Sequence, residues 1–516
     1  MTIPSPTEQR QKLPVIFAAL MTTMLMSSLG QMIFATALPT IVGELGGVDH
    51  MSWVISVFLA GMTIAMPISG KVGDLVGRKW IYVGSIGMFV LGSAIGGFAN
   101  SMGMLIFGRA VQGLAAGSMM INSQAIIAEV TTARERGKFM GMMGAVFGLS
   151  SVLGPVLGGW FTDGPGWRWG MWMNIPLGLL AMTVATLVLR LRTGSAQWRR
   201  FDWLGTALMA LTTSSLILLT TWGGTEYAWT SSTILGLGVA VIVGALLFII
   251  VEKRAQDPLI PMGLFRNRNM ALTTASGVVV GLAMVGVLAY TPTYLQMVHR
   301  LTPTTAGLMM IPMMVGMIGT STTVGIIISR TGNYKFYPIV GMVIVAATLG
   351  ALSTLTPQTT LTVVGIMFFF FGLGLGMVMQ VLVLIVQNSF PIRLVGTATA
   401  TNNFFRQIGS SLGASVVGSM FISNMHDRMA EYLPEAFAKM GPAGAELAQK
   451  FAGQTGSSNR LTPAAVNELP GPVRDAVVSA YNDGLTPIFL MMVPLALLAA
   501  ALLLPLRQDR LKETIS

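Results

Sequence analysis

The sequence has no cysteine, three histidines and few charged residues, which make up 10% of its 516 positions. Without cysteine the chain can form no disulfide and no metal–thiolate site, and it offers no thiol nucleophile. Hydrophobic residues account for 53% of the chain and the mean hydropathy is +0.70, which a water-soluble globular protein of this length would not show. The composition therefore predicts an integral membrane protein embedded in the lipid bilayer.

The net charge of +11 raises the question of a nucleic-acid partner. Lysines and arginines, however, occur in short clusters between apolar stretches and form no continuous basic stripe, so we expect no nucleic-acid binding. The polar start "MTIPSPTEQRQKLP" leads into an apolar stretch that is too long for a signal-peptide core and lacks a small-residue cleavage site. The first membrane span should therefore be retained.

Long apolar segments alternate with polar or glycine- and proline-rich breaks along the whole chain. A membrane-spanning helix needs about 20 mostly apolar residues, and fourteen segments meet this requirement. The sequence thus predicts an all-α fold with fourteen transmembrane helices. They are expected at Pro14–Val42, Met51–Gly70, Trp80–Phe98, Met104–Ala128, Phe139–Phe161, Gly170–Leu189, Trp203–Trp222, Thr233–Val251, Met270–Val298, Ala306–Ser329, Phe336–Leu355, Thr359–Val386, Ala398–Phe421 and Leu485–Leu506.

Positive charge indicates how the chain is oriented, because lysine and arginine are retained on the cytoplasmic side of a membrane. With both termini inside, 22 of the 31 lysines and arginines fall in inner segments and 7 in outer ones, while Arg109 and Arg406 lie within spans. An odd number of spans would remove this asymmetry. We therefore expect a multi-pass protein of the plasma (inner) membrane with both termini in the cytoplasm.

Glycines recur at a nearly constant distance between the two halves of the chain. Small residues at helical spacing also form packing seams, but the constancy of the shift favours duplication. The halves predict six-helix bundles at 1–192 and 270–516, with two inserted helices and a linker at 193–269 and a long extracellular loop at 422–484. The recurring pairs are Gly70 and Gly325, Gly77 and Gly332, Gly113 and Gly372, Gly117 and Gly376, Gly137 and Gly396, Gly154 and Gly413, and Gly159 and Gly418.

The two halves differ at positions where chemistry is expected. Asp74 corresponds to Ser329, Arg109 to Phe368 and Pro155 to Ala414. The first half thus keeps two charges and a proline that the second half lacks, an asymmetry that suggests directional work.

Four motifs resemble those of the major facilitator superfamily, and specifically its fourteen-span drug:proton antiporter branch. "GKVGDLVGRKW" is similar to the inner-loop signature between spans two and three, and "GRAVQGLAAGS" to the motif of span four. "GLSSVLGPVLGGW" resembles the antiporter motif of span five, and "ATALPTIVGEL" resembles the end of the span-one motif. The resemblance covers nearly the whole chain and implies a multidrug efflux transporter, linked to antibiotic resistance, that is a monomer, carries small molecules and exchanges them for protons.

The resemblance assigns gating and coupling roles to residues of these motifs. Asp74, near a helix end beside Lys71 and Arg78, can form a charge-assisted latch to a neighbouring helix N-terminus. Arg109 would cost about 2.5–3.5 kcal/mol if it faced lipid, so it should face the bundle interior, either for proton transfer or to tie spans one and four together. Gly154 and Pro155 should permit a kink and close helix contact. The full set is Gly70, Asp74, Gly77, Arg78, Lys79, Arg109, Gln112, Gly113, Gly154, Pro155, Gly158 and Gly159.

The chain departs from the branch at one position. The first helix of the branch usually carries an aspartate several residues before the Ala-Leu-Pro element, and here that position is Gly30. None of the 20 acidic residues reaches the middle of a span, and His50, His299 and His426 are expected on the outer side. Several routes therefore stay open: coupling through Asp74 or Glu129 at the inner gate, coupling through Glu44 or Glu226 at the outer mouth, or transport of an anion without a carrier acid.

Polar and aromatic residues inside apolar helices are the candidates for binding a substrate. Arg406 in "NNFFRQIGSSLG" is expected near the middle of the membrane, and with Arg109 it would favour neutral or anionic amphiphiles; alternatively it only donates to backbone carbonyls. The 39 methionines add a flexible lining or serve as core residues. The candidates are Gln31, Phe34, Asn122, Gln124, Tyr290, Tyr294, Gln380, Gln387, Asn402, Phe405, Arg406 and Gln407.

Other classes of protein fit less well. "GSSLG" at Gly409–Gly413 matches a hydrolase pattern, but it lies in a predicted span with no histidine on a nearby helix. "GLGLG" at Gly372–Gly376 is not preceded by a strand or followed by Lys-Ser/Thr, so it does not predict a nucleotide site. We expect neither an enzyme nor a cofactor or metal. The predicted function is export of amphipathic molecules or drugs by alternating access with proton antiport; the alternatives are uncoupled transport of a neutral or anionic metabolite and a non-transporting membrane sensor.

Overall fold

The computed structural model describes residues 6–45, 50–191, 201–224, 226–445 and 468–509, and the single residues 448, 466 and 511. Almost all of these residues are helical. The helices of the first half are α1 (Pro6–Leu45), α2 (Met51–Val76), α3 (Arg78–Gly97), α4 (Met102–Val130), α5 (Ala133–Asp163), α6 (Trp169–Trp172) and α7 (Asn174–Val188).

Two helices separate the first half of the chain from the second. These two are α8 (Trp203–Trp222) and α9 (Ser232–Arg254). The second half contains η3 (Met262–Arg266), α10 (Arg268–Val298), α11 (Pro303–Leu308), α12 (Ile311–Thr331), α13 (Phe336–Leu352), α14 (Leu361–Ser389), η4 (Ile392–Leu394), α15 (Val395–Lys439) and α18 (Gly471–Leu503).

Every segment predicted to span the membrane overlaps a helix, but the number of spans is not confirmed. Among the described residues, eleven helices are long and apolar enough to cross a membrane, and α13 is a shorter apolar helix. The expected boundary between residues 192 and 193 lies outside the described residues.

Helix ends follow local sequence signals. The hydroxyl of Thr132 accepts from the backbone N–H of Glu135, whose carboxylate accepts from the Thr132 N–H, so the start of α5 carries a capping box. Asp202 and Ser231 cap α8 and α9 with their side chains. α8 and α9 begin at or next to the predicted Trp203 and Thr233, whereas the capping box starts α5 at Ala133, ahead of the predicted Phe139.

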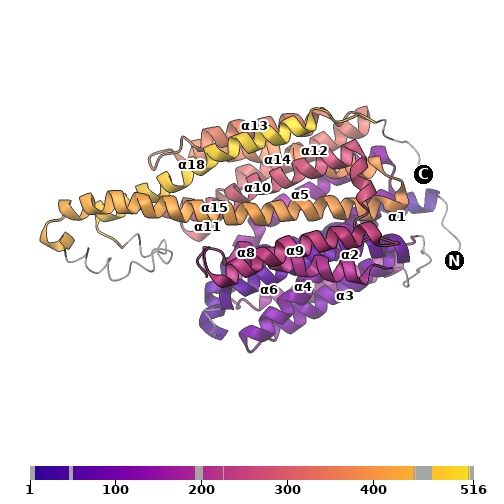
Figure 1. The fold of residues 1–516 in the computed structure, drawn as a ribbon, viewed down its shortest axis with the longest axis horizontal. Helices are drawn as coiled ribbons and strands as arrows, with labels where there is room; N and C mark the ends of the chain where they lie inside the picture. The colour runs from indigo at the N-terminus through magenta and orange to yellow at the C-terminus, as the bar shows by residue number, and fades with distance from the viewer. Residues whose placement is uncertain are drawn as a thin grey trace.

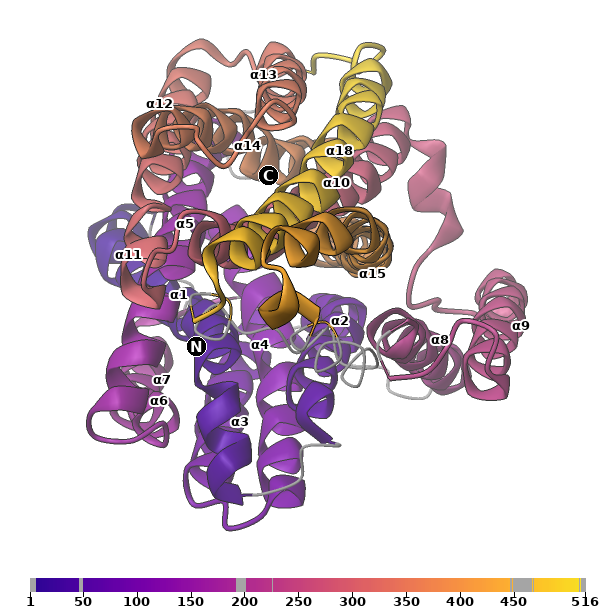
Figure 2. The same ribbon diagram turned by 90° about the vertical axis from the view of Figure 1, so that its left-hand side faces the viewer.

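The helices form two groups with the inserted pair at one side. In Figure 2 α2–α4, α6 and α7 make the lower group and α10, α12–α14 and α18 make the upper group, while α1, α5, α11 and α15 lie between them. α8 stands beside α2 and α15, and α9 lies on the far side of α8. Figure 1 shows that the helices run roughly side by side and that α1 begins at the end of the molecule where α18 finishes. A chain that crosses the membrane an even number of times has both of its termini on the same side.

Close helix contacts repeat between the halves. A Cβ on Gly113 would lie 2.3 Å from the carbonyl oxygen of Phe58, and a Cβ on Gly372 would lie 1.9 Å from that of Met313. Likewise, Gly117 lies against Met62 of α2, and Gly376 against Met317 of α12. The carbonyls concerned are 255 residues apart in both cases, so the packing of α4 on α2 recurs as the packing of α14 on α12, as expected for a duplication.

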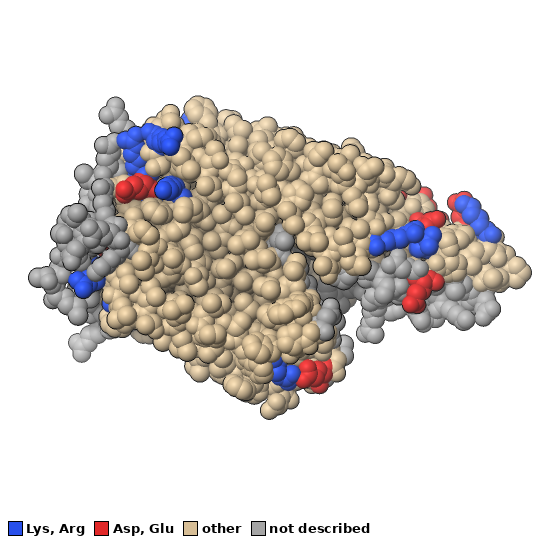
Figure 3. Space-filling model, turned by 180° about the vertical axis from the view of Figure 1, so that it is seen from behind, with Lys and Arg blue, Asp and Glu red and all other residues tan. Residues whose placement is uncertain are grey.

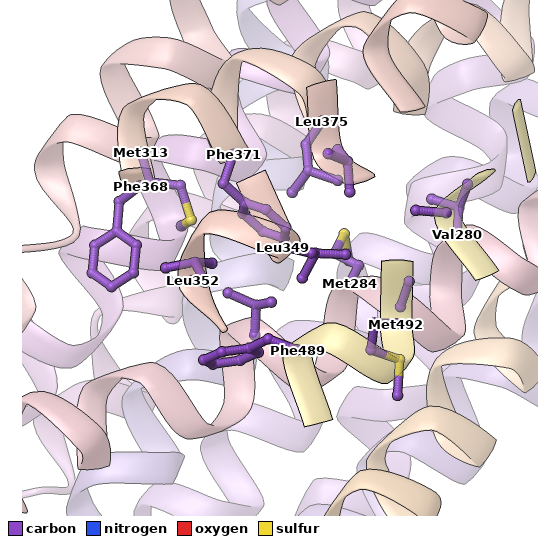
Figure 4. Close-up of a cluster of buried hydrophobic side chains, with 14 of the residues drawn as sticks. Val280, Met284, Met313, Leu349, Leu352, Phe368, Phe371, Leu375, Phe489 and Met492 are labelled. Atoms are coloured by element: carbon purple, nitrogen blue, oxygen red, sulfur yellow. The ribbon is translucent and has the colours of Figure 1, made fainter. Parts of the chain in front are cut away.

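The second half has an apolar core where the first half has a buried cation. Phe368, the counterpart of Arg109, is buried in a cluster with Met313, Leu352 and Phe371, and Figure 4 shows these side chains converging from α12, α13 and α14. The difference between the halves that the sequence predicts at this position is therefore a difference between an apolar interior and one that contains a charge.

The loop expected at 422–484 is largely helical where the structure describes it. α15 does not end near Phe421 but continues to Lys439, and α18 begins at Gly471, before the span predicted at Leu485. In Figure 1 this extension of α15 projects beyond the other helices, and Figure 3 shows charged residues gathered on it. Hydropathy marks where a segment leaves the membrane, whereas the helix continues because Met425 and Met429 stay buried on one face.

Candidate gate and transport interior

The two halves touch closely where α2 crosses α15. A Cβ on Gly70 would lie 2.5 Å from the Cβ of Ala400 and 2.8 Å from the carbonyl oxygen of Gly396. A Cβ on Gly396 would lie 2.4 Å from a carboxylate oxygen of Asp74. The absence of side chains at Gly70 and Gly396 therefore lets the two backbones meet and brings Asp74 to the start of α15.

Asp74 binds the first turn of α15. Its Oδ2 accepts from the backbone N–H of Thr397 at 2.7 Å and from the Thr397 hydroxyl at 2.8 Å. A helix N-terminus has unpaired N–H groups and favours a negative charge. The contact between Asp74 and a neighbouring helix N-terminus, predicted from the sequence, is present, and Thr397 is its partner.

Arg78, the first residue of α3, forms hydrogen bonds with three other helices: α2, α4 and η4. It donates to Asp74 Oδ1 at 2.8 Å, to Glu129 Oε2 at 3.2 Å, and to the carbonyl oxygens of Ala125 and Ile392 at 2.9 Å. Gly77, at φ +105°, lets the chain turn from α2 into α3 and so places Arg78 beside Asp74. Ile392 belongs to the second half, so Arg78 also crosses between the halves.

The two lysines of the motif do not join this contact. Lys79 donates to the carbonyl oxygen of Thr186 at 2.7 Å near the end of α7, where a cation is favoured. Lys71, a neighbour of Asp74 in the sequence, forms its ion pair with Asp257 in the segment that follows α9. It thereby links α2 to the inserted helices.

A second crossing joins α5 to α12. A Cβ on Gly325 would lie 2.3 Å from the carbonyl oxygen of Gly137, and the hydroxyl of Ser321 donates to the carbonyl oxygen of Gly141 at 2.8 Å. Arg134 donates to the carbonyl oxygen of Ser329 at 2.7 Å. Gly325 and Gly137 are the sequence counterparts of Gly70 and Gly396, so the second crossing repeats the glycine pairing of the first.

Arg109 lies in the interior of the first half, as expected, and is 1% exposed. It donates to the carbonyl oxygen of Gly30 at 2.9 Å and to Gln112 Oε1 at 3.1 Å. Its guanidinium lies 4.5 Å from the ring centroid of Phe34 and 4.0 Å from that of Phe58. These contacts tie α4 to α1 and α2, which is the structural alternative that the sequence left open.

Gln112 and Gly113 extend this packing. Gln112 Nε2 donates to the hydroxyl of Ser93 at 2.7 Å, which joins α4 to α3. Gly113 meets the backbone of Phe58, as described above. Both residues thus hold α4 within its own bundle.

The span-five motif makes one close contact. A Cβ on Gly154 would lie 2.2 Å from the Cβ of Met32, so Gly154 permits α5 to approach α1. A Cβ on Gly159 would meet nothing within 4 Å, so Gly159 makes no such approach. Gly158 is buried and its carbonyl oxygen accepts from Thr162. Pro155 lies within α5, and its side chain is outside the described part of the structure.

Several substrate candidates meet where α4, α14 and α15 join. Asn403 Nδ2 donates to Gln124 Oε1 at 2.9 Å, and Arg406 Nη2 donates to Asn403 Oδ1 at 2.5 Å. Gln387 Nε2 donates to the carbonyl oxygen of Gln124 at 3.1 Å. Hydrogen bonds thus connect the two halves through one group of polar side chains, which consists of Gln124, Gln387, Asn403 and Arg406. Arg136 of α5 donates to the carbonyl oxygen of Gln387 as well.

Other candidates bind neighbouring helices. Tyr294 donates to Asn482 Oδ1 at 2.9 Å, and Asn402 donates to the hydroxyl of Thr274. Asn122 donates to the carbonyl oxygen of Ser118 in its own helix, and its Oδ1 would lie 2.8 Å from a Cβ built on Gly73 of α2. Phe34 is fully buried beside Arg109, and Phe405 packs against Phe265. These five side chains are therefore engaged in helix packing.

Four candidates have fewer specific contacts. The ring of Tyr290 packs against Phe421 with the centroids 5.4 Å apart. Gln31 and Gln407 are partly exposed, and the buried Oε1 of Gln380 has no hydrogen-bond partner in the described structure. Gln380 lies beside Gly144 of α5, so it faces the other half of the molecule.

The four carboxylates considered for coupling, Asp74, Glu129, Glu44 and Glu226, lie near helix ends or, for Glu226, in the connection between α8 and α9. Glu44 pairs with Arg168 and accepts from the indole N–H of Trp167 at 2.7 Å, and these hydrogen bonds lower the pKa of Glu44. Glu226 accepts from the Ser52 hydroxyl at 2.6 Å. Burial lowers the pKa of His299, which favours its neutral form. Within the described part of the chain, no carboxylate forms an ion pair with Arg109 or Arg406.

Sequence reasoning missed several residues that join the halves. Thr397, Ser321, Arg134 and Arg136 make cross-half contacts and lie outside the motifs quoted above. Asn403 also makes such a contact and lies within "NNFFRQIGSSLG", but it was not among the candidates. The recurrence of glycine at Gly137 and Gly396 was the available signal, since close crossings bring flanking polar groups together.

The sequence profile of the Major Facilitator Superfamily matches residues 20–414. An uncharacterized MFS-type transporter of Mycobacterium tuberculosis is 36% identical over 499 residues, which cover 97% of this chain and 70% of the relative. Multidrug transporter protein MdtP of Bacillus subtilis is 33% identical over 487 residues, 92% of this chain and 89% of its own length.

Two solved structures share the fold at low sequence identity. The human organic anion transporter MFSD10 is 15% identical with a TM-score of 0.61, and covers 97% of this chain and 100% of its own. The proton:xylose symporter XylE is 12% identical with a TM-score of 0.59, and covers 96% and 95% respectively. With the profile match and the curated relatives, these findings show that the chain belongs to the Major Facilitator Superfamily, whose members are membrane transporters and not enzymes.

Proposed function

We propose that the protein exports small amphipathic molecules, including drugs, from the cytoplasm by alternating access. The observation that carries this proposal is the paired glycine crossing of α2 with α15 and of α5 with α12, with Asp74 bound to the start of α15. Multidrug transporter protein MdtP supports drugs as substrates, and a further relative, the MFS-type efflux pump MMF1 of Mycosarcoma maydis, supports export as the direction.

The contacts at the crossings suit a gate. The hydrogen bonds between Asp74 and Thr397, Arg78 and Ile392, and Gln124 and Asn403 all lie within the part of the helices nearest the α2–α3 turn. The gate opens toward that side only when these contacts break together. We assign this side to the cytoplasm because of the lysine and arginine distribution, in a plasma membrane protein that works as a monomer.

Protons are the coupling ion that the family resemblance implies. In this chain the groups available at the gate are Asp74 and Glu129, both of which bind Arg78. Protonation of either would weaken the contact and favour opening. Coupling through the gate is therefore the first candidate.

Uncoupled transport of a neutral or anionic molecule is the second candidate. It is favoured by one observation: the buried Arg109 binds the Gly30 carbonyl, at the position where an aspartate would be expected. A cation held in this way needs no exchangeable proton nearby.

Reconstitution in vesicles with an imposed pH gradient tests both candidates. Proton antiport predicts that proton movement, read from an entrapped pH dye, accompanies substrate movement and that an opposite gradient reverses it. Substrate movement that is indifferent to the gradient supports the second candidate. If no amphipathic compound of any charge moves faster than in empty vesicles, the export function is wrong.

A further inference from the structure

The polar group between α4 and α15 has a fixed direction of hydrogen bonding. A guanidinium can only donate, so Asn403 must present its Oδ1 to Arg406. The Asn403 amide therefore directs its Nδ2 toward Gln124, and Gln124 must accept this hydrogen bond with its Oε1. Gln124 Nε2 is then left over, and it is a buried donor without a partner in the described structure.

Hydrogen-bond donors that lack acceptors, from both halves, thus lie around the side-chain amide of Asn403. Arg406 Nη2 is bound to Asn403 Oδ1, and the described structure gives the rest of the guanidinium no partner. Gln124 belongs to α4 of the first half and is fully buried. Thr399, one turn of α15 closer to the gate than Asn403, has a buried hydroxyl that is likewise without a partner. Buried donors without acceptors are costly, so they indicate a missing acceptor.

The position suits a ligand rather than a structural ion pair. Asn403 binds across the interface, and Arg406 lies one turn further from the gate on the same face of α15. The Arg406 side chain keeps part of its surface accessible, while its Cβ lies 3.8 Å from a Cβ built on Gly277 of α10. A molecule entering from the side away from the gate would meet Arg406 before the Gln124–Asn403 contact.

We infer that Arg406 and Gln124 bind the acidic head group of an organic anion, a carboxylate or sulfonate with an apolar body. The inference rests on the proposed export function and names its substrate class. A carboxylate or sulfonate supplies only acceptors, which is what the unpaired guanidinium and amide donors require. Because the donors come from α4 and α15, the bound anion joins the two halves beside the gate. Gln387 Oε1, a buried acceptor without a partner, leaves a place for a donor group on the same ligand.

Two probes with the same ring and opposite permanent charge test this assignment: naphthalene-2-sulfonate and trimethyl(2-naphthyl)ammonium. Equilibrium dialysis with the purified full chain should show binding of the sulfonate in preference to the ammonium. Arg406→Gln should weaken sulfonate binding by about tenfold or more, as loss of a charge-assisted hydrogen bond implies. Arg406→Lys should bind with intermediate strength, and Gln124→Leu should also bind more weakly. Arg428→Gln is the matched control, because Arg428 is exposed on the extension of α15 and pairs with Glu431.

The outcomes separate this inference from the export function. Thermal unfolding confirms that each variant is folded, and Gln124→Leu keeps the test decisive if Arg406→Gln does not fold. Unchanged sulfonate binding in both folded variants, binding of neither probe, or preference for the ammonium overturns the inference. Vesicle transport of the ammonium but not the sulfonate would leave export intact and reject the anionic substrate, whereas movement of neither would count against export itself.

Discussion

Gly70 of α2 and Gly396 of α15 meet so closely that neither has room for a Cβ, and Asp74 lies directly beside them. The same relationship recurs between Gly325 of α12 and Gly137 of α5, without an acid at the counterpart of Asp74, which is Ser329. One crossing therefore carries a charged latch, whereas the other is held by backbone approach and by Arg134. Sensitivity to loss of a carboxylate at the position of Asp74 should therefore be confined to the first crossing.

Gly70→Ala should impair the closed gate. The added Cβ would lie 2.5 Å from the Cβ of Ala400 and 2.8 Å from a backbone oxygen, so α2 and α15 must separate. Overpacking costs about 1–3 kcal/mol, which lowers the population of the closed state by roughly 5- to 150-fold. Vesicle export rates should fall accordingly. Gly84→Ala in α3 is the matched control, because a Cβ there meets nothing within 4 Å; equal rates for both variants would contradict the role of the crossing.

Asp74→Asn should reduce export more than Thr397→Val does. The first change removes the charge that Arg78 and the α15 N-terminus both bind, whereas the second removes one hydroxyl hydrogen bond, worth about 1 kcal/mol. Breaking a buried ion pair costs about 3–5 kcal/mol, and here Glu129 still pairs with Arg78 and lessens the loss. We expect export to fall at least tenfold for Asp74→Asn and less for Thr397→Val. Wild-type export by Asp74→Asn would remove the latch from the mechanism.

The sequence predicted the helices and the latch because both have local signals. Apolar runs of membrane length fix the helices, and the glycines around Asp74 mark a tight turn and a close crossing. The partner of Asp74 could not be predicted, since Thr397 lies 323 positions away and its side chain is common in helices. Charge and hydropathy describe single segments, whereas a latch depends on which segments meet.

The roles of the substrate candidates could not be predicted from the sequence for the same reason. Tyr294, Asn402 and Asn122 are polar residues in apolar helices, and the sequence cannot distinguish those that bind a neighbouring helix from those that face the transport interior. The end of α15 was misplaced for a related reason, because a helix that leaves the membrane keeps its backbone hydrogen bonds and need not stop.

Glu44 should make stability depend on pH at the end opposite the gate. Its pKa is lowered from 4.5 by hydrogen bonds with Arg168 and Trp167, so its contribution is fully present above 4.5 and is lost as the pH falls through the lowered folded pKa. The melting temperature of the wild type should therefore exceed that of Glu44→Gln at pH 6, and the gap should close as the pH falls below 4.5. High salt should shrink the gap because Glu44 is half exposed. A gap that is constant with pH would show that Glu44 acts through packing alone.

A disulfide between α8 and α15 should stop transport. The inserted helices are fixed to α2 by the ion pair of Lys71 with Asp257 and by the rings of Trp53 and Trp222, whose centroids are 4.9 Å apart. The hydroxyls of Thr220 and Ser411, 2.8 Å apart, join α8 to α15 of the other half, and Trp229 in the connection between α8 and α9 donates to the Ser419 hydroxyl at 3.2 Å.

Rocking of the two halves must therefore slide α8 along α15. Because the chain has no cysteine, Thr220→Cys with Ser411→Cys introduces the only two thiols. Oxidation should block export and a reductant should restore it, while each single variant stays active. Full export by the oxidised double variant, with cross-linking verified by mass spectrometry, would mean that α8 moves with the second half.

Gly30→Asp should make transport responsive to a pH gradient. The Gly30 carbonyl already accepts from Arg109 at 2.9 Å, and a Cβ there would meet only the Phe89 ring at 3.4 Å, so a carboxyl group fits beside the guanidinium. A carboxylate next to a buried arginine exchanges its proton as its surroundings change from solvated to closed. We expect an inward proton gradient to accelerate export by this variant severalfold, beyond its effect on the wild type. Gly30→Asn, which has the same shape and no titrating group, is the control, and an equal response of both variants to the gradient would show that a carboxyl group at this position cannot couple proton movement to transport.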